Sequence, residues 1–285
     1  MKLEVIAAEF LQDKKVYCAP KTIESYSDHV NRFLQSDEVP EDLENLTKSI
    51  LRKYVLQMRE EGIRSVTIQT YMRSVKVFCK WLYNEGYLDE DISKGLKLPK
   101  EDPKMKIPLT EDEVKRIDEA LPLTRDRIIF HLMIDAGLRV SEVCNLKRDD
   151  IDFENNYIRI RNSKNNRNRV VPLCARLKNW TRYHYSGTEY LLAAKNGEKL
   201  SDNAVKQVFH GLKKKAAVPR LHCHLCRHTF ATSYIMGGGN MEMLRMMMGH
   251  TDYNTTKIYL QMAAEYSIVK YPIYKLDPVF FERGY

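Results

Sequence analysis

Helical periodicity dominates the first third of the chain. Apolar side chains recur at three- and four-residue steps over residues 22–34, 47–61 and, most clearly, 65–85. This spacing places the apolar positions on one face of an α-helix. The third segment carries a second, polar stripe beside the apolar one, formed by Gln69, Arg73, Lys76 and Lys80. The pattern predicts a helical domain over residues 1–98, in which one helix offers a basic face to solvent or to a polyanion.

Residues 99–108 interrupt the periodic pattern. They contain three prolines among charged residues, which is typical of a linker. Thr110 and Glu113 then have the spacing of a capping box, which predicts the start of a helix. Helical patterns continue to about Gly137 and begin again at Val140. We expect residues 109–285 to form a second domain, with a C-terminal tail from about residue 261.

One short β-hairpin is predicted inside the second domain. Apolar and polar residues alternate over residues 157–161, and residues 169–173 can return antiparallel after the polar turn 163–166. Helical patterns resume at Ser201. The predicted fold class is therefore mainly α with a small antiparallel β-sheet, an α+β protein of two domains.

Basic residues are segregated along the chain. The total of 46 Lys and Arg against 38 Asp and Glu gives a net charge of +8. Residues 155–188 and 203–241 contain fourteen basic and no acidic residues, which leaves a net charge of −6 on the rest of the chain. Such segregation suits a groove that neutralises a phosphodiester backbone, and the alternative is a solvated basic face.

The composition excludes membrane-spanning and disulfide-stapled classes of protein. The chain has no apolar run of 18 residues, and its first ten residues are acidic and amphipathic, unlike a secretory signal. Six scattered cysteines fit a reduced compartment, so we expect a cytoplasmic protein with no membrane partner. Cys223 and Cys226 form one CxxC pair, but a structural zinc site needs a second ligand pair, and we predict no metal.

Three short motifs in the second domain carry candidate chemistry. His224 and Arg227 stand three residues apart and would share one face of a helix. Arg139 is followed one turn later by Glu142, and the pair Gly249-His250 is followed by Tyr259. Each motif alone has an ordinary structural explanation, such as a surface ion pair or a buried aromatic ring.

Together and in this order, the motifs resemble the signature of the tyrosine recombinases, the lambda-integrase and Xer group. The resemblance rests on Arg139 within GLRVSE, Lys164 in the basic hairpin, HLCRHTF at 224–230, and GH followed by Tyr259. Residues 21–26 and 65–71 are similar to the helical core-binding domain of that family. The resemblance covers nearly the whole chain and implies a core-binding domain followed by a catalytic domain.

A recombinase of this kind would cleave and rejoin duplex DNA through a 3′-phosphotyrosyl link to Tyr259, without metal, nucleotide or other cofactor. Arg139 and Arg227 suit the non-bridging phosphate oxygens, because guanidinium groups stay charged and bind phosphate in bidentate fashion. His250 would donate one more hydrogen bond to the phosphate.

Proton transfer needs two further groups. We expect His224 to accept the proton of the phenol, whose ordinary pKa is about 10. Lys164 is expected to protonate the leaving 5′-hydroxyl, because arginines do not deprotonate in proteins. Glu142 would orient Arg139.

The resemblance also implies the partners. We expect double-stranded DNA with inverted half-sites, a homotetramer on synapsed DNA that is a monomer or weak oligomer when free, and accessory DNA-bending proteins in the nucleoid. The apolar tail is expected to dock on its own domain or on a neighbouring subunit. The expected DNA contacts are Arg73, Lys76, Lys80, Arg161, Arg167 and Arg169.

Two other functions are alternatives to recombination. A DNA-binding relative without activity predicts the loss of a catalytic position, and none is lost. A type IB topoisomerase would share the chemistry, but the compact helical first domain favours recombination. Integration of a mobile element and resolution of chromosome dimers both remain open as biological roles.

Overall fold

The computed structural model describes residues 1–285 except 101–106, 122–123, 162–167, 185, 251–252 and 271–285. The chain divides into two compact units, Met1–Lys104 and Met105–Tyr285. The architecture is mostly helical with one small antiparallel sheet, so the predicted fold class is confirmed. No helix among the residues described has the length and apolar character needed to span a bilayer.

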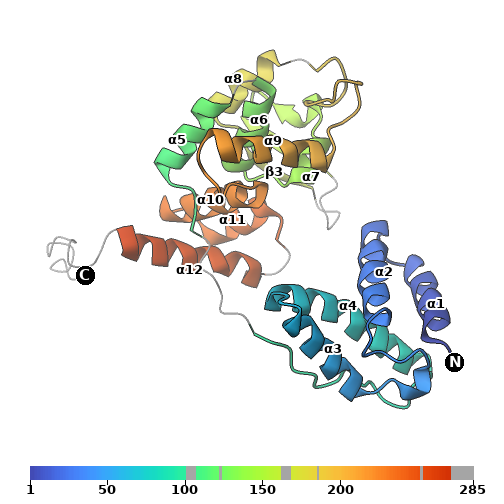
Figure 1. The fold of residues 1–285 in the computed structure, drawn as a ribbon. Coiled ribbons are helices and arrows are strands. Elements are labelled where there is room, and N and C mark those ends of the chain that lie inside the picture. The colour runs from blue at the N-terminus through green and yellow to red at the C-terminus, as the bar shows by residue number, and fades with distance from the viewer. Residues whose placement is uncertain (101–106, 122–123, 162–167, 185, 251–252, 271–285) are drawn as a thin grey trace. The chain divides into compact units, whose positions relative to one another are not determined.

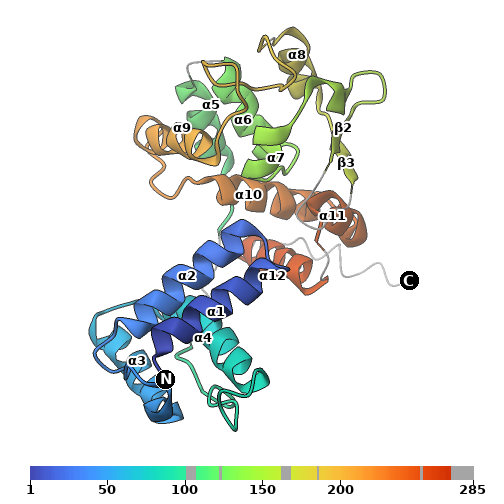
Figure 2. The same ribbon diagram turned by 90° about the vertical axis from the view of Figure 1, so that its right-hand side faces the viewer.

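The first unit is a helical bundle (Figures 1 and 2). Its core contains Phe10, Phe33 and Phe78, all fully buried, and the rings of Phe10 and Phe78 lie 5.2 Å apart. Helix α4 buries the apolar stripe predicted from the sequence, so its periodicity determines which face packs inward. The elements are α1 (Leu3–Lys15), α2 (Pro20–Leu34), the 3₁₀ helix η1 (Leu43–Asn45), α3 (Lys48–Glu60) and α4 (Ser65–Asn84).

The second unit is built around helix α10 (Cys223–Met236), which packs against α6 (Thr124–Ile134) and α12 (Tyr253–Lys270) (Figures 1 and 2). Leu225, Cys226 and Ala231 of α10 are buried in the core. The other elements are α5 (Glu111–Ala120), α7 (Val140–Asn145), η2 (Arg148–Asp150), β1 (Ile151–Asp152), β2 (Tyr157–Ile160), β3 (Arg169–Pro172), α8 (Ala175–Tyr183), α9 (Asp202–Lys215) and α11 (Met241–Met248).

Several local predictions are confirmed in this unit. The Thr110 hydroxyl accepts from the Glu113 amide at 3.2 Å, and the Glu113 carboxylate accepts from the Thr110 amide at 2.8 Å, which completes the capping box of α5. The predicted hairpin forms, with Ile160 opposite Arg169. The edge strand β1 was not predicted, because two residues are too few for alternation to be visible.

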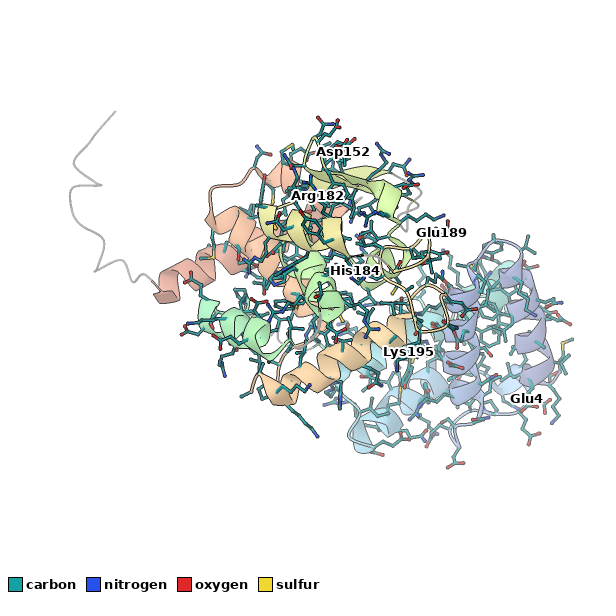
Figure 3. The ribbon with its side chains drawn as sticks, turned by 90° about the horizontal axis from the view of Figure 1, so that it is seen from above. Glu4, Asp152, Arg182, His184, Glu189 and Lys195 are labelled. Atoms are coloured by element: carbon teal, nitrogen blue, oxygen red, sulfur yellow. The ribbon has the colours of Figure 1, made fainter. Side chains whose placement is uncertain are left out.

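Arginine caps one helix end beside the sheet. The Arg148 guanidinium donates to the carbonyl oxygens of Thr181, Arg182 and His184 at 3.3, 2.9 and 2.8 Å. These carbonyls have no partner further along α8, so the cap satisfies them where the helix ends, near the labelled Arg182 and His184 (Figure 3).

Helix α12 continues through residue 261, the point at which we expected a tail to begin. Met262 and Ala263 are buried on the same helix as Tyr259. The stretch beyond Lys270, on which the docking expectation depends, lies outside the described residues.

Candidate active site

The end of helix α11 is the structural centre of the site. Gly249 closes the helix in the left-handed region, with φ of 60° and ψ of 43°. A helix end leaves carbonyl groups without partners inside the helix and carries partial negative charge. The carbonyl oxygens of Met247, Met248 and Gly249 therefore attract cationic donors.

Three arginines from distant parts of the chain meet these carbonyl groups. They come from strand β3, from helix α10 and from the residue before α7. Each carbonyl oxygen accepts from a different guanidinium: Met247 from Arg169 Nε (2.6 Å), Met248 from Arg227 Nη2, and Gly249 from Arg139 Nη2 (3.2 Å). We call Arg139, Arg169 and Arg227 the arginine cluster. Through this cluster β3, α10 and the start of α7 are all bonded to the C-terminal end of α11.

Glu142 is the counter-ion of the arginine cluster. Its Oε1 accepts from Arg139 Nη1 at 2.9 Å and from Arg169 Nη1 at 2.8 Å, and its Oε2 accepts from Arg169 Nη2 at 2.7 Å. Arg227 Nη1 lies 4.0 Å from the same Oε2. Burial acts to raise the pKa of Glu142, but the hydrogen bonds and charge of Arg169, aided by Arg139, outweigh it and lower the pKa to about 2.

The cluster has an excess of positive charge in a buried place. Three guanidiniums and one carboxylate leave a net charge of +2, and Arg227 is only 5% exposed. Burial and the nearby charge of Arg139 lower the pKa of Arg227 to about 9, so it is still a cation at neutral pH. Such crowding of like charge is relieved by an anion that binds between the arginines.

Tyr259 faces this charge from helix α12. Its side chain is 4% exposed, and its hydroxyl lies 3.0 Å from His228 Nδ1. Burial raises the pKa of the phenol, whereas the charges of Arg227 and Arg139 act to lower it. The phenol is therefore neutral at rest and lies within the electrostatic field of two arginines.

His250 completes the group. Its ring stacks on Tyr259 with centroids 6.2 Å apart, and its Nδ1 lies 3.0 Å from Thr256 Oγ1. Burial, together with the charges of Arg227 and the other arginines of the cluster, lowers the pKa of His250 to about 4. The imidazole is therefore neutral at pH 7 and has one N–H to donate.

The structure brings together five of the predicted site residues, namely Arg139, Glu142, Arg227, His250 and Tyr259. His224 is exposed on α10, one turn before His228. Lys164 lies outside the described residues. Sequence reasoning missed His228 as the neighbour of the phenol. The four-residue spacing from His224, which places both imidazoles on one helix face, was the available signal.

The expected DNA contacts differ in how exposed their side chains are. Arg73 and Lys80 are exposed on α4, whereas Lys76 is partly buried and its Nζ donates to the Leu96 carbonyl at 2.9 Å. Arg161 is 51% exposed and pairs with Asp150. Arg167 falls within a segment whose structure is not described.

Arg169 differs from the expectation of a DNA contact. Its side chain is only 7% exposed, and its guanidinium binds Glu142 and the Met247 carbonyl. The reason is that alternate residues of a β-strand point to the same face of the sheet. Arg169 stands two residues before the buried Val171 and shares its inward face.

A groove of about 630 Å³ adjoins the arginine cluster. Its lining includes the basic residues Arg139, Lys147, Arg159 and Arg161 and the acidic residues Glu142 and Asp150, which leaves a net charge of +2. This net positive charge favours the approach of a phosphodiester backbone to Arg139.

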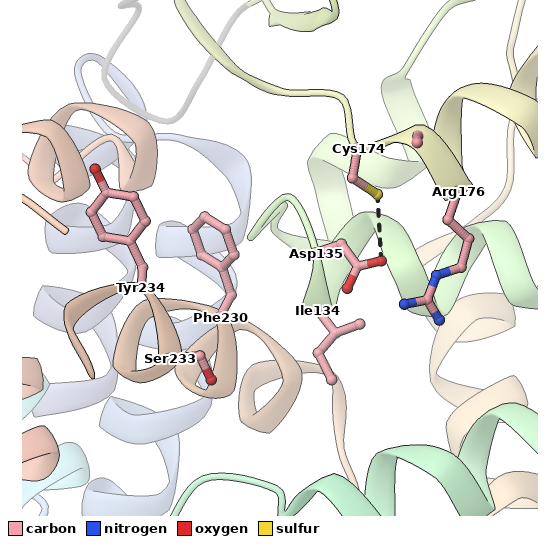
Figure 4. Close-up of a pocket in the computed structure, with 8 residues that line it drawn as sticks. Ile134, Asp135, Cys174, Arg176, Phe230, Ser233 and Tyr234 are labelled. Atoms are coloured by element: carbon pink, nitrogen blue, oxygen red, sulfur yellow. Dashed lines mark hydrogen bonds between the residues drawn. The ribbon is translucent and has the colours of Figure 1, made fainter. Parts of the chain in front are cut away.

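A second hollow, of about 570 Å³, contains none of the predicted site residues (Figure 4). Phe230, Ser233 and Tyr234 of α10 line it, and the Cys174 thiol contacts Asp135 Oδ2 at 3.7 Å on another side. In the part of the chain that the structure describes, no group of three or more His, Cys, Asp or Glu residues is arranged to hold a metal ion.

Comparison with known proteins identifies the class to which this fold and site belong. The phage integrase family matches residues 108–265, and the phage integrase N-terminal SAM-like domain matches residues 8–86. The tyrosine recombinase XerA of Thermococcus onnurineus is 34% identical over 259 residues, which are 87% of each chain. XerA of Pyrococcus furiosus is 30% identical and covers 93% of this chain and 94% of its own.

Solved structures agree on the fold. A lambda integrase dimer bound to a COC′ core site covers 91% of this chain and 95% of its own, with a TM-score of 0.78 at 18% identity. A crystal structure of XerA recombinase covers 94% and 97%, with a TM-score of 0.52 at 24% identity.

The chain therefore belongs to the phage integrase family of tyrosine recombinases, enzymes of site-specific DNA recombination. The resemblance seen in the sequence is confirmed, and none of these matches favours the topoisomerase or the inactive DNA-binding relative.

Proposed function

We propose that this recombinase cleaves duplex DNA by attack of Tyr259 on a phosphate held by Arg139 and Arg227. The observation that carries the proposal is the largely buried net charge of +2 next to the phenol of Tyr259. A phosphodiester gains negative charge on its non-bridging oxygens in the transition state, and fixed guanidiniums stabilise that state more than the ground state. In this proposal His250 Nδ1 accepts from the Thr256 hydroxyl, so the single N–H of the neutral ring is on Nε2 and donates to the phosphate.

In the cleavage step, the Tyr259 oxygen forms a bond to phosphorus and the bond from phosphorus to the 5′-oxygen breaks. The phenolic proton goes to a histidine of α10. The 3.0 Å hydrogen bond supports His228 as the acceptor, whereas the family motif supports His224. Lys164 gives a proton to the leaving 5′-oxygen, which becomes a 5′-hydroxyl, and Glu142 orients Arg139 through the hydrogen bond at 2.9 Å.

We propose that neither a metal ion nor a nucleotide takes part. Cationic side chains neutralise the phosphate, which is the role that a metal ion serves in many phosphoryl-transfer enzymes. The 3′-phosphotyrosyl link keeps the free energy of the broken phosphodiester. A second 5′-hydroxyl can therefore reverse the attack and reseal the strand.

The proposed substrate is a duplex with two inverted half-sites. Solved relatives include a lambda integrase dimer on a core site and a lambda integrase tetramer on a Holliday junction. By analogy, four copies of this chain form the synapse, and the free protein is a monomer or weak oligomer. The proposed DNA contacts are Arg73, Lys80, Arg161 and Arg167. Accessory DNA-bending proteins and a location in the nucleoid belong to the same proposal.

A covalent trapping experiment tests the function. A target duplex is first selected from a random pool with the Tyr259→Phe variant, which keeps the arginine cluster. The selected duplex is then nicked near the cleavage position, so that the released fragment diffuses away and the adduct accumulates. Wild-type protein is expected to form a covalent adduct in the presence of a chelator, and Tyr259→Phe to form none. An adduct that persists in the Phe variant, or that the chelator abolishes, would refute the mechanism.

A further inference from the structure

We propose that Arg169 is a positioning residue of the recombination site, one that holds Glu142 so that Arg139 and Arg227 remain available to the phosphate. The inference deepens the function proposed above and rests on it. Arg169 lies on β3, and its contacts extend to α7 and to the end of α11.

Arg169 and Glu142 form a bidentate ion pair. Nη1 donates to Oε1 at 2.8 Å and Nη2 donates to Oε2 at 2.7 Å, so both oxygens of the carboxylate are oriented by one planar group. Nε donates at 2.6 Å to the Met247 carbonyl, which fixes the guanidinium from its other side. The two side chains are 7% and 6% exposed. The Arg139 backbone N–H also donates to Oε2 at 2.8 Å, but Arg169 is the side chain that holds both oxygens of the Glu142 carboxylate.

Glu142 would otherwise compete with the substrate. Its Oε1 already accepts from Arg139 Nη1 at 2.9 Å, and its Oε2 lies 4.0 Å from Arg227 Nη1. Loss of Arg169 leaves the buried carboxylate to be neutralised by these two guanidiniums. A scissile phosphate would then have to displace a carboxylate from the donors that it needs.

Loss of Arg169 also changes the net charge of the arginine cluster. The cluster has a net charge of +2, which falls to +1 when Arg169 is replaced by a neutral residue. Replacing Glu142 by Gln in the same protein restores +2 and removes the competing carboxylate. The double variant should therefore recover part of the activity that the single variant loses.

Arg161 differs from Arg169 in its exposure to solvent. It belongs to the same basic hairpin, yet it is 51% exposed, as a residue that touches DNA would be. A phosphate contact contributes to affinity and to the dependence of affinity on salt. A buried positioning residue contributes to the rate of cleavage once DNA is bound.

The test compares Arg169→Met with the double variant Glu142→Gln/Arg169→Met on the nicked, selected duplex. The rate of adduct formation is measured at saturating DNA, and affinity is measured against salt in the Tyr259→Phe background. We expect Arg169→Met to lower the rate by about 10²-fold, the cost of misplaced groups in an active site, with affinity and salt slope unchanged. The double variant should react at least about tenfold faster than the single one. Arg116→Met is the matched control and should react as wild type, because Arg116 is exposed on α5 and donates to the Ala216 and Ala217 carbonyls rather than to the arginine cluster.

Each other outcome overturns the inference. A weaker affinity with a salt slope shallower by about one would make Arg169 a phosphate contact. A wild-type rate in Arg169→Met would remove it from the site, and a double variant no faster than the single one would show that packing, not charge, is lost. If Arg169→Met does not fold, the test uses Arg169→Lys, which keeps the positive charge but cannot form the bidentate pair. A wild-type cleavage rate in Arg169→Lys would refute the proposal. Absence of any wild-type adduct would instead refute the proposed function itself.

Discussion

Replacing Gly249 by alanine adds one methyl group next to the arginine cluster and so tests its geometry. The Gly249 φ of 60° lies in the left-handed region, where an L-residue costs about 1–2 kcal/mol. A Cβ at this position would lie 3.3 Å from Arg169 Cδ and Nη1 and 3.4 Å from Arg139 Nη1. The Arg169 side chain would have to move by a few tenths of an ångström, whereas the distance to Arg139 Nη1 is that of an ordinary contact. Gly249→Ala should therefore disturb the cluster as well as strain the backbone.

Gly187 is the matched control in the same unit. Its φ is 77°, and a Cβ there would meet nothing within 4 Å. We expect Gly187→Ala and Gly249→Ala to lose similar free energies of unfolding, about 1–2 kcal/mol each in urea denaturation. Only Gly249→Ala should slow adduct formation, by about tenfold, since misplacement by a full ångström costs about 10²-fold. Equal cleavage rates in the two variants would refute the claim that the packing around Gly249 sets the arginine geometry.

Three further predictions concern pH, salt and proton transfer. The folded pKa of His250, about 4, is below its unfolded value of about 6.5, so its contribution to stability is complete above pH 6.5 and is lost as pH falls toward 4. The loss is at most about 3 kcal/mol, and His250→Gln should flatten this part of the pH–stability curve; an unchanged slope would contradict the assignment. Arg161→Met should weaken DNA binding and reduce the salt slope by about one, and an unchanged slope would exclude a phosphate contact. His228→Gln should reduce the cleavage rate by about 10²-fold or more, whereas a larger loss in His224→Gln would assign proton acceptance to His224.

The helices were the part of the fold that the sequence predicted best. In α4, apolar residues at helical spacing coincide with the side chains that are buried, because one amphipathic stripe has only one way to face a core. The two-residue strand β1 was not predictable in this way. It exists because Ile151 and Asp152 pair with the hairpin, which is a tertiary contact with no periodic signal of its own.

The candidate site was predictable as a set of residues but not as a set of contacts. Arg139, Arg227 and Tyr259 stood out by motif, yet no pattern in the sequence indicated that α11 would end beneath three arginines. Arg161 and Arg169 have the same chemistry and lie close in sequence, and only the burial of the face shared by Arg169 and Val171 separates them. That separation depends on which face of the sheet packs inward, which the register of the hairpin decides.

Gly137 illustrates a position whose role only the structure explains. Its φ is 67°, and the Phe230 ring lies against the space where a Cβ would be. Its carbonyl oxygen accepts from Arg227 Nη1. Gly137, two residues before Arg139, therefore allows α10 to approach closely enough for Arg227 to join the cluster.

The most direct measurement is to locate the covalent bond. The adduct trapped on the nicked duplex is digested with protease and nuclease, and the modified peptide is sequenced by mass spectrometry. Our account predicts a nucleotide esterified through its 3′-phosphate to Tyr259. A nucleotide on Tyr253 or on any other side chain, or one attached through its 5′-phosphate, would contradict it.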